Sequence, residues 1–279
     1  MDYRDNLKEY LINIKNNNFE IPKEVEVYDL VLNMMKNIGT IDSELRDNFI
    51  FTLIFYIIKD RKISNDEMKK LLEICLSEDH LFYKIGNIED DSVFNRAFSV
   101  LVIDDIIMAN NGEKTKFLNN NEIIDVYNKV LNYFIEEKDL RGYVNEKGWA
   151  HSVAHTADAL CSLVKCECIK KKEIGNILKA IKEKVCVDNY TYINEEDERL
   201  TNIVVEILNR DIISNDEILQ WIQCFRNVNY KGKYPEDGHL KENRKKFLRS
   251  LYFRLIKLGY DKKIVEEINT ILRETSNFY

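Results

Sequence analysis

The pattern of hydrophobic and polar positions along the chain predicts helices joined by short polar loops. Apolar residues recur at helical spacing, and the predicted helices of the first half are residues 1–16, 27–36, 42–59, 65–76 and 91–110. Those of the second half are residues 120–137, 148–165, 169–184, 195–209 and 215–225, a long helix carrying Arg244 and Arg249, and residues 262–274. Only two prolines and nine glycines interrupt the 279 residues. So few helix breakers favour an all-α fold over a β-sandwich or barrel.

Two identical capping boxes suggest that the chain contains a repeat. Ser64-Asn65-Asp66-Glu67 returns as Ser214-Asn215-Asp216-Glu217, 150 residues later. Arginines recur at steps near 50 residues, at positions 46, 96, 199 and 249. A period near 50 with two helices per unit is typical of HEAT and armadillo solenoids. We therefore predict one right-handed α-solenoid domain over residues 1–279, with about five helical hairpins plus terminal caps.

The recurring arginines suggest a binding groove. Arg46, Arg96, Arg199 and Arg249 each stand near the start of a second helix, and interpolation between Arg96 and Arg199 falls near Lys147 or His151. Because second helices line the concave surface of such solenoids, these side chains would form a row along one groove. In the alternative interpretation, each arginine pairs with a neighbouring acid, such as Asp47 or Asp197, and ties one repeat to the next.

Charge and composition restrict the classes of function. A net charge of −7 makes a nucleic-acid binder unfavourable, since such proteins neutralise phosphates with a basic excess. Residues 1–6 lack the apolar core of a signal peptide, and the most apolar run, residues 49–58, is about half the length that spans a bilayer. We expect a cytoplasmic protein without membrane association, whose six cysteines are reduced thiols.

The stretch from Gly142 to Leu160 is the leading site candidate. It holds Trp149, His151 and His155, that is, one of two tryptophans and two of four histidines. On a helix with about 100° per residue, one face would carry Lys147, His151, His155, Asp158 and Ser162. The opposite face would carry Val153, Ala157, Leu160 and Val164 and pack into the core.

Three interpretations of this stretch remain open. Histidines at i and i+4 suit one divalent metal, with Asp158 as a third ligand and Glu196, Asp197 or His239 completing the set. A metal-free site would use imidazoles and arginines to hold an anionic or amide-bearing ligand. In a structural role, the histidines would bond to adjacent repeats and Trp149 would pack in the core.

A hydrolase-like enzyme using His151, His155 and Asp158, with or without a divalent metal, is the alternative from another functional class. A serine nucleophile is poorly supported. Ser152 points about 100° away from His151, and Ser162 lies about 10 Å along the helix from His155. Either imidazole remains a candidate general base.

A family resemblance rests on these residues. The segments Asp139–Val144 and Lys147–His151, followed by His155 and Asp158, resemble a bacterial family known as domain of unknown function 2785. Residues 45–47, 92–99, 196–200 and 247–253 resemble it too. The resemblance covers nearly the whole chain and implies a HEAT or armadillo-like helical repeat, but it implies no particular reaction.

We therefore predict a helical-repeat protein that binds a peptide, a protein segment or a small anionic molecule in a groove. Its expected ligand contacts are Arg96, Arg141, Trp149, His151, His155, Asp158, Arg199 and Arg249. No cofactor is expected unless the histidine pair holds a divalent metal. A structural adaptor that uses only its outer faces is the third alternative.

Overall fold

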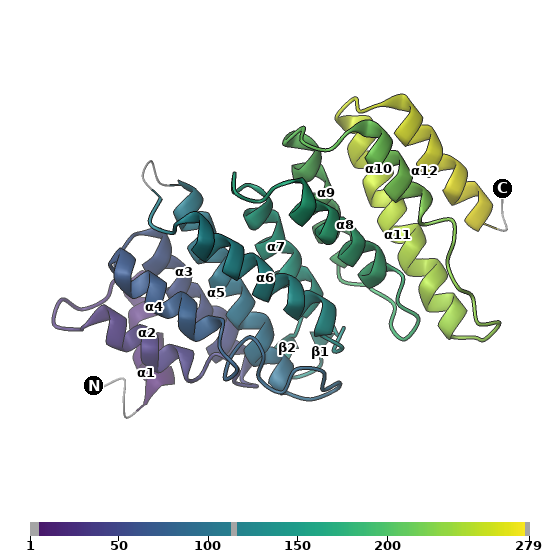
Figure 1. Ribbon diagram of the computed structural model, residues 1–279. Helices are drawn as coiled ribbons and strands as arrows, with labels where there is room; N and C mark the ends of the chain where they lie inside the picture. Colours follow the sequence, from purple (N-terminus) through teal and green to yellow (C-terminus); the bar gives the residue numbers. More distant parts are fainter. Residues whose placement is uncertain (1–5, 113–115, 277–279) are drawn as a thin grey trace. The chain divides into compact units, whose positions relative to one another are not determined.

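A computed structural model describes residues 6–112 and 116–276, which fold into helices and a single short β-hairpin. The all-α prediction is confirmed. The chain forms two compact units, residues 1–162 and 163–279 (Figure 1). The single-solenoid prediction is not tested by this division and stays a prediction.

The first unit is built from the N-terminal helices and the hairpin. Its elements are α1 (Leu7–Asn16), α2 (Val27–Met35), the π-helix η1 (Glu44–Phe51), α3 (Thr52–Lys59), α4 (Asn65–Cys75), α5 (Ser92–Gly112), α6 (Asn120–Glu136), β1 (Tyr143–Val144), β2 (Gly148–Trp149) and α7 (Ser152–Val164), whose last two residues belong to the second unit. Residues 1–5 of the first predicted helix lie outside the described residues.

Helix α5 is the centre of the first unit. It packs against α3 and α4, and η1 packs against α1 and α3. Most of the α5 side chains are buried, including Phe94, Phe98 and Ile103. A helix that is apolar nearly all round is stable only when other helices cover it, which explains why this segment lies at the middle of the unit.

The helix predicted from Asp42 to Lys59 consists of two different parts. Asp42 does act as the predicted cap, since its Oδ1 accepts the Leu45 amide at 3.0 Å. The first eight helical residues, however, form the wider π-helix η1 before α3 continues. π-helical turns are rare and occur often at functional sites. Here the turn carries Arg46 and Asp47, which hold the hairpin described below.

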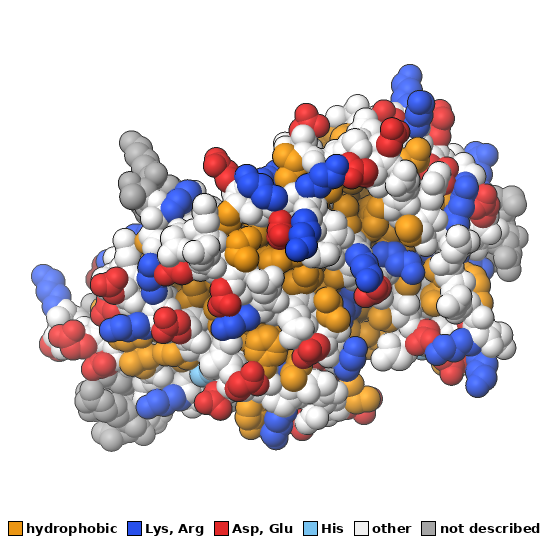
Figure 2. All heavy atoms as spheres, in the orientation of Figure 1, with side chains coloured by type: hydrophobic (Ala, Val, Ile, Leu, Met, Phe, Trp, Pro, Cys, Tyr) orange, Lys and Arg blue, Asp and Glu red, His pale blue; other side chains and the backbone are white. Residues whose placement is uncertain are grey.

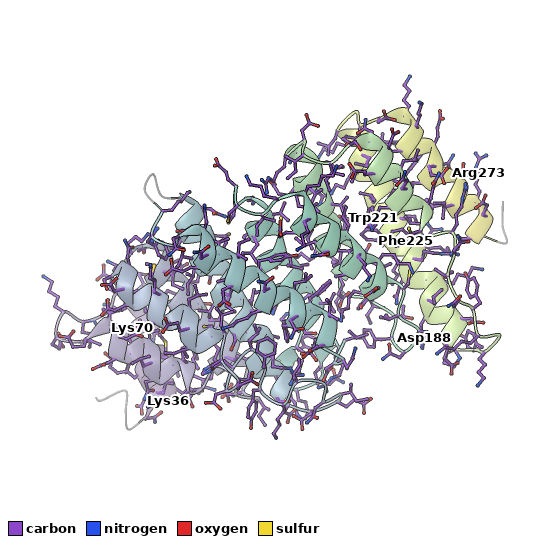
Figure 3. All side chains as sticks on the ribbon, in the orientation of Figure 1. Lys36, Lys70, Asp188, Trp221, Phe225 and Arg273 are labelled. Carbon is purple, nitrogen blue, oxygen red and sulfur yellow. The ribbon has the colours of Figure 1, made fainter. Side chains whose placement is uncertain are left out.

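The second unit contains α8 (Lys171–Val185), α9 (Glu196–Asn209), α10 (Asn215–Gln223), α11 (Glu236–Lys257) and α12 (Lys262–Thr275). Helix α11 packs against α8, α9 and α12, and α12 also packs against α10 (Figure 1). Aromatic rings fill the space between α10 and α11: Trp221 and Phe225 lie 5.3 Å apart, and Phe225 stacks on Phe247 (Figure 3). The buried Trp221 indole donates to the Leu178 carbonyl at 2.7 Å.

Both predicted capping boxes are confirmed. Ser64 accepts the Glu67 amide and the Glu67 side chain accepts the Ser64 amide, and Ser214 and Glu217 do the same. In each case a residue with positive φ precedes the serine by three positions, namely Arg61 (54°) and Asp211 (49°). The same turn and the same cap therefore recur 150 residues apart, which supports the predicted repeat at the level of local structure.

Charged side chains of both signs are interspersed on the face shown in Figure 2, where the described residues form no large area of one charge. Within residues 6–112 and 116–276, no helix has the length and apolar character that crossing a membrane requires.

Candidate functional site

The candidate stretch begins as a β-hairpin, not as a helix. Tyr143 pairs with Trp149 and Val144 with Gly148 in an antiparallel register, and α7 starts only at Ser152. The prediction of a helix over 148–165 is therefore wrong at its start. Positive φ angles at Glu146 (65°) and Gly148 (78°) turn the chain, and helical φ angles are negative.

His151 stands immediately before α7 in a left-handed conformation, with a φ of 49°. The helical projection that placed Lys147 and His151 on one face with His155 is wrong for this reason. The apolar face is nevertheless confirmed, because Val153, Ala157, Leu160 and Val164 are all buried. The His151 and His155 rings still meet edge to face, with centroids 5.4 Å apart.

A series of ring contacts runs from the surface into the core. The Trp149 ring stacks on His151 at 4.7 Å with 21° between the planes, and Tyr143 meets the Trp149 ring edge-on at 5.1 Å. On the inner side, His155 meets Phe98 edge-on at 5.5 Å. Trp149 is 39% exposed and Tyr143 is 54% exposed, so the structural interpretation that packed Trp149 in the core is wrong.

His155 forms the inner part of this series. It is only 9% exposed, and its Nδ1 lies 3.3 Å from the Ala97 carbonyl oxygen. A carbonyl oxygen only accepts hydrogen bonds, so Nδ1 carries a proton. The contact orients the ring and ties α7 to α5. His155 thus supports His151 from below and presents little surface of its own.

The hairpin is fixed to η1 by Arg46 and Asp47. Arg46 is fully buried, and its guanidinium donates to the carbonyls of Lys147 and Thr40, both at 2.7 Å. The Asp47 carboxylate accepts the Trp149 amide and lies 2.8 Å from Arg46 Nε. Burial raises the pKa of Asp47, although the Arg46 charge opposes that shift. The predicted pairing of Arg46 with Asp47 is confirmed. The predicted position of Arg46 in an open groove is wrong, because its guanidinium is buried and bonds to backbone carbonyls.

Gly148 makes this close approach feasible. A Cβ atom at this position would lie 2.7 Å from Ser43 Cβ and 3.0 Å from Arg46 Nη2. Its φ of 78° is also one that glycine adopts without strain. The other strand of the hairpin is held by Val144, which packs against a buried cluster of Val93, Phe94 and Ala150.

Gly148→Ala is expected to lower the free energy of unfolding by about 2 kcal/mol, from the left-handed backbone together with the collision at Ser43. Gly86→Ala is the matched control. Gly86 has a similar φ of 87° but open space around its Cβ position, so its cost should be only the backbone strain, about 1 kcal/mol. Urea unfolding of both variants measures the difference. Equal losses would show that the hairpin does not press on η1.

Arg96 and Arg141 belong to an ionic network beneath the hairpin. Arg96 is fully buried and forms two hydrogen bonds to the Glu137 carboxylate, at 2.6 and 3.0 Å. Burial by itself would lower the pKa of Arg96, but Glu137 raises it overall. Arg141 donates hydrogen bonds from Nε and Nη2 to the Asp139 carboxylate and a further one to the Asp90 carbonyl. Arg96 therefore faces the interior, and the Arg141 charge is matched by Asp139.

The remaining predicted contacts are dispersed. Asp158 is half-buried on α7. Arg199 on α9 and Arg249 on α11 are exposed and belong to the second unit. Arg46 and Arg96 do not belong to the expected row of exposed arginines. Both guanidinium groups are buried, where Arg46 donates hydrogen bonds to carbonyl oxygens and Arg96 to a carboxylate.

The hydroxyl groups nearest to the histidines in the sequence bond to backbone carbonyls. Ser152 is buried and donates to the Asp139 carbonyl at 2.6 Å, and buried Thr156 donates to the Ser152 carbonyl. Neither hydroxyl is placed as a nucleophile beside an imidazole. Among the described residues, no group of three or more His, Cys, Asp or Glu side chains is arranged to hold a metal ion. The proposed ligand set around His151, His155 and Asp158 is thus incomplete.

Sequence reasoning did not single out two residues of this site. Tyr143 extends the exposed aromatic surface, and Gly148 permits the close contact with η1. The glycine of the Gly148-Trp149 dipeptide, directly after the polar residues 145–147, is a turn signal that could have indicated the hairpin.

Comparisons with known proteins connect this region with one family. A family model described as "Protein of unknown function (DUF2785)" matches residues 81–253, more than half of the chain, including the hairpin and both histidines of α7 and its start. No curated protein and no solved structure matches the chain.

Proposed function

Because this chain belongs to the DUF2785 family of proteins of unknown function, we propose a function from the site itself: the surface formed by Tyr143, Trp149 and His151 binds a peptide segment of a partner protein. We call these three residues the aromatic surface. The observation that carries the proposal is the exposed Trp149 ring, stacked on His151 and flanked by Tyr143. Tryptophan and tyrosine are the residues most enriched at binding hot spots.

The aromatic surface is held rigidly from below. The Arg46 and Asp47 contacts fix the backbone of residues 147–149, and the His155 ring supports His151. A surface that is already ordered loses little conformational entropy when a ligand binds. The buried Arg46 and the left-handed Gly148 therefore hold the exposed Trp149 in one position.

The charges around the aromatic surface favour a peptide over a small anion. Lys147 is paired with Asp91 at 2.8 Å, and Arg141 is paired with Asp139 at 2.6 Å. The cations adjacent to the hairpin are thus already matched by carboxylates. A peptide can instead lay an apolar or aromatic side chain on Trp149 and use its amides at the rim.

Peptide selection tests this proposal. A random peptide library displayed on phage should yield binders to the full chain, and Trp149→Ala should weaken their binding by about tenfold or more. Phe253→Ala is the matched control, since Phe253 is an exposed ring on α11, outside the aromatic surface. Binders that lose as much affinity with Phe253→Ala as with Trp149→Ala, or a selection without enrichment, would contradict the proposal.

We also keep two broader parts of the sequence interpretation as proposals. The helix pairs form a right-handed solenoid of HEAT or armadillo type, which the recurring turn and capping box 150 residues apart support. The protein acts in the cytoplasm, a proposal supported by its six cysteines, all of which are free thiols.

A further inference from the structure

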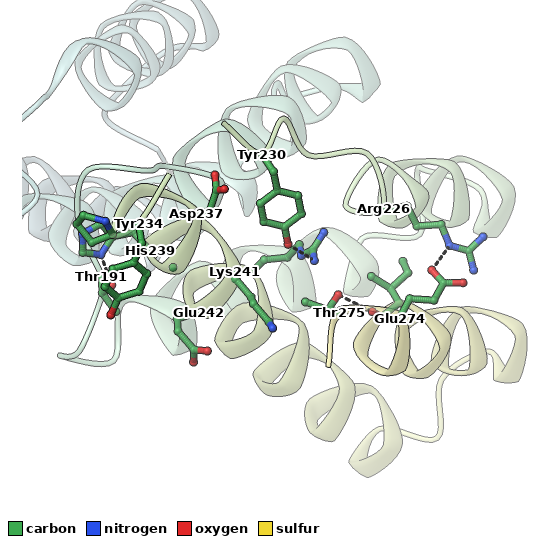
Figure 4. A pocket seen from close by; sticks show the side chains of 14 residues that line it. Thr191, Arg226, Tyr230, Tyr234, Asp237, His239, Lys241, Glu242, Glu274 and Thr275 are labelled. Atoms are coloured by element: carbon green, nitrogen blue, oxygen red, sulfur yellow. Dashed lines mark hydrogen bonds and ion pairs between the residues drawn. The ribbon is translucent and has the colours of Figure 1, made fainter. Parts of the chain in front are cut away.

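The second unit contains a cavity that the aromatic surface does not involve. Its volume is about 760 Å³, within the usual range for small-molecule sites. The loop before α11, the first two turns of α11 and the end of α12 line it, together with Thr191 (Figure 4). Tyr230 and Tyr234 supply aromatic rings, and Arg244 reaches it from α11.

Every carboxylate that lines this cavity is already engaged. Asp237 accepts the backbone amides of Lys231 and Lys233, at 2.7 and 3.1 Å. Glu242 pairs with Lys245 at 3.1 Å. Glu274 pairs with Arg226, as Figure 4 shows, and Arg226 pairs with Glu267 as well.

Two cations that line the cavity form no ion pair with a carboxylate of the described residues. Arg244 is only 4% exposed; it donates to the Phe225 carbonyl and the Tyr230 hydroxyl, both at 2.9 Å. Its Nε has no hydrogen-bond acceptor among the described residues, and no carboxylate there pairs with its charge. Lys241, half-buried one helical turn earlier, likewise makes no hydrogen bond or ion pair in the described part of the chain.

A buried guanidinium without a counter-charge is costly, and a carboxylate or phosphate is the partner that matches its geometry. Arg96 of this same chain shows the usual solution, since two hydrogen bonds join it to Glu137. At Arg244 none of the described residues supplies such an anion, and an open cavity lies beside the charge. We propose that this cavity binds a small organic anion, whose phosphate or carboxylate group is held by Arg244 and Lys241.

The rest of the lining suggests that the anion carries a planar ring. Tyr230 lies with its ring 5.7 Å from the Arg244 guanidinium, and Tyr234 and Pro235 continue the apolar rim. His239 is held by Thr191 at 2.6 Å and adds a polar group at the same edge (Figure 4). Rings of this kind stack on a planar ligand while the cations bind its charged group.

Calorimetric titration of the full chain with phenyl phosphate, benzoate and neutral benzamide tests the proposal. At least one of the two anions should bind one per chain and more tightly than benzamide, and comparison of the two separates a phosphate site from a carboxylate site. Arg244→Gln should weaken that binding by about tenfold or more. Because Arg244 is buried and its replacement could prevent folding, Lys241→Gln provides the independent test, with severalfold weaker binding expected.

Lys257→Gln is the matched control. It removes the same charge from the same helix, about 24 Å farther along its axis, and should leave binding unchanged. Equal binding of benzamide and the anions, no binding of either anion, or an equal loss in Lys241→Gln and Lys257→Gln would overturn the proposal.

Discussion

Glu137→Ala is expected to lower the free energy of unfolding by about 3 to 5 kcal/mol, the usual cost of removing one partner from a buried ion pair. The variant leaves the Arg96 guanidinium fully buried and without its carboxylate. It also removes the acceptor of the Asp139 amide, at 2.9 Å, and so loosens the segment that leads into the hairpin. Urea unfolding followed by circular dichroism measures the loss.

Two further variants identify the cause of that loss. Asp125→Ala, on the helix α6 that Glu137 follows, breaks the exposed pair with Lys129 and should cost at most about 0.5 kcal/mol. The double variant Arg96→Met/Glu137→Leu removes both charges and should recover part of the stability. A double variant no more stable than Glu137→Ala would show that lost packing, and not the unpaired guanidinium, causes the instability.

Asp105→Asn is expected to raise the free energy of unfolding at pH 8 by about 5 kcal/mol, at about 1.4 kcal/mol for each pKa unit by which the folded and unfolded states differ. Burial, with a smaller contribution from Asp104, raises the pKa of Asp105 to about 8. The side chain is 6% exposed, and its Oδ2 has no hydrogen-bond partner among the described residues. It lines a small, mostly apolar cavity beside Phe55 and Met108.

The effect of Asp105 depends on pH in a defined direction. Between the ordinary aspartate pKa of 3.8 and about 8, the folded state keeps a proton that the unfolded state has released. The free energy of unfolding therefore falls as the pH rises through this window, and levels off above it. An asparagine side chain does not titrate, so the Asp105→Asn variant should match wild type near pH 4 and exceed it at pH 8. An equal difference at both pH values would contradict the raised pKa.

Local features of the fold could be predicted from the sequence. The capping boxes at Ser64 and Ser214 depend on residues three positions apart, and both are confirmed. The apolar face of α7 follows from helical spacing alone, and it too is confirmed. The resemblance to DUF2785 is confirmed over residues 81–253. The bacterial origin of the protein and the solenoid arrangement of its helices stay predictions.

The predictions that are wrong concern features formed by residues far apart in the chain. The hairpin forms because Gly148 fits against Ser43 and the Arg46 guanidinium, more than 100 residues earlier. Helical periodicity carries no information about such a contact. Similarly, Arg96 is buried because Glu137 faces it from the end of α6. Arginines that recur about every 50 residues can be exposed in a groove or buried in the core. Which of the two occurs depends on whether a carboxylate or carbonyl group lies opposite the guanidinium in the folded protein.

The sequence pattern points to Arg249 and not to Arg244. The period of 50 residues indicates Arg249, which is exposed on α11. Arg244 is a buried guanidinium beside a cavity, and none of the carboxylates in the described part of the chain forms an ion pair with it. Charge balance in space is not visible in a single sequence.

The most direct test of the aromatic surface is an NMR titration of the protein labelled with 15N-tryptophan. The chain has two tryptophans, and the Trp221 indole is buried and bonded to Leu178, so the two indole signals are readily told apart. On addition of a selected peptide, the Trp149 indole signal should shift in proportion to binding while the Trp221 signal stays in place. A bound peptide that leaves the Trp149 signal unmoved would contradict the proposed function.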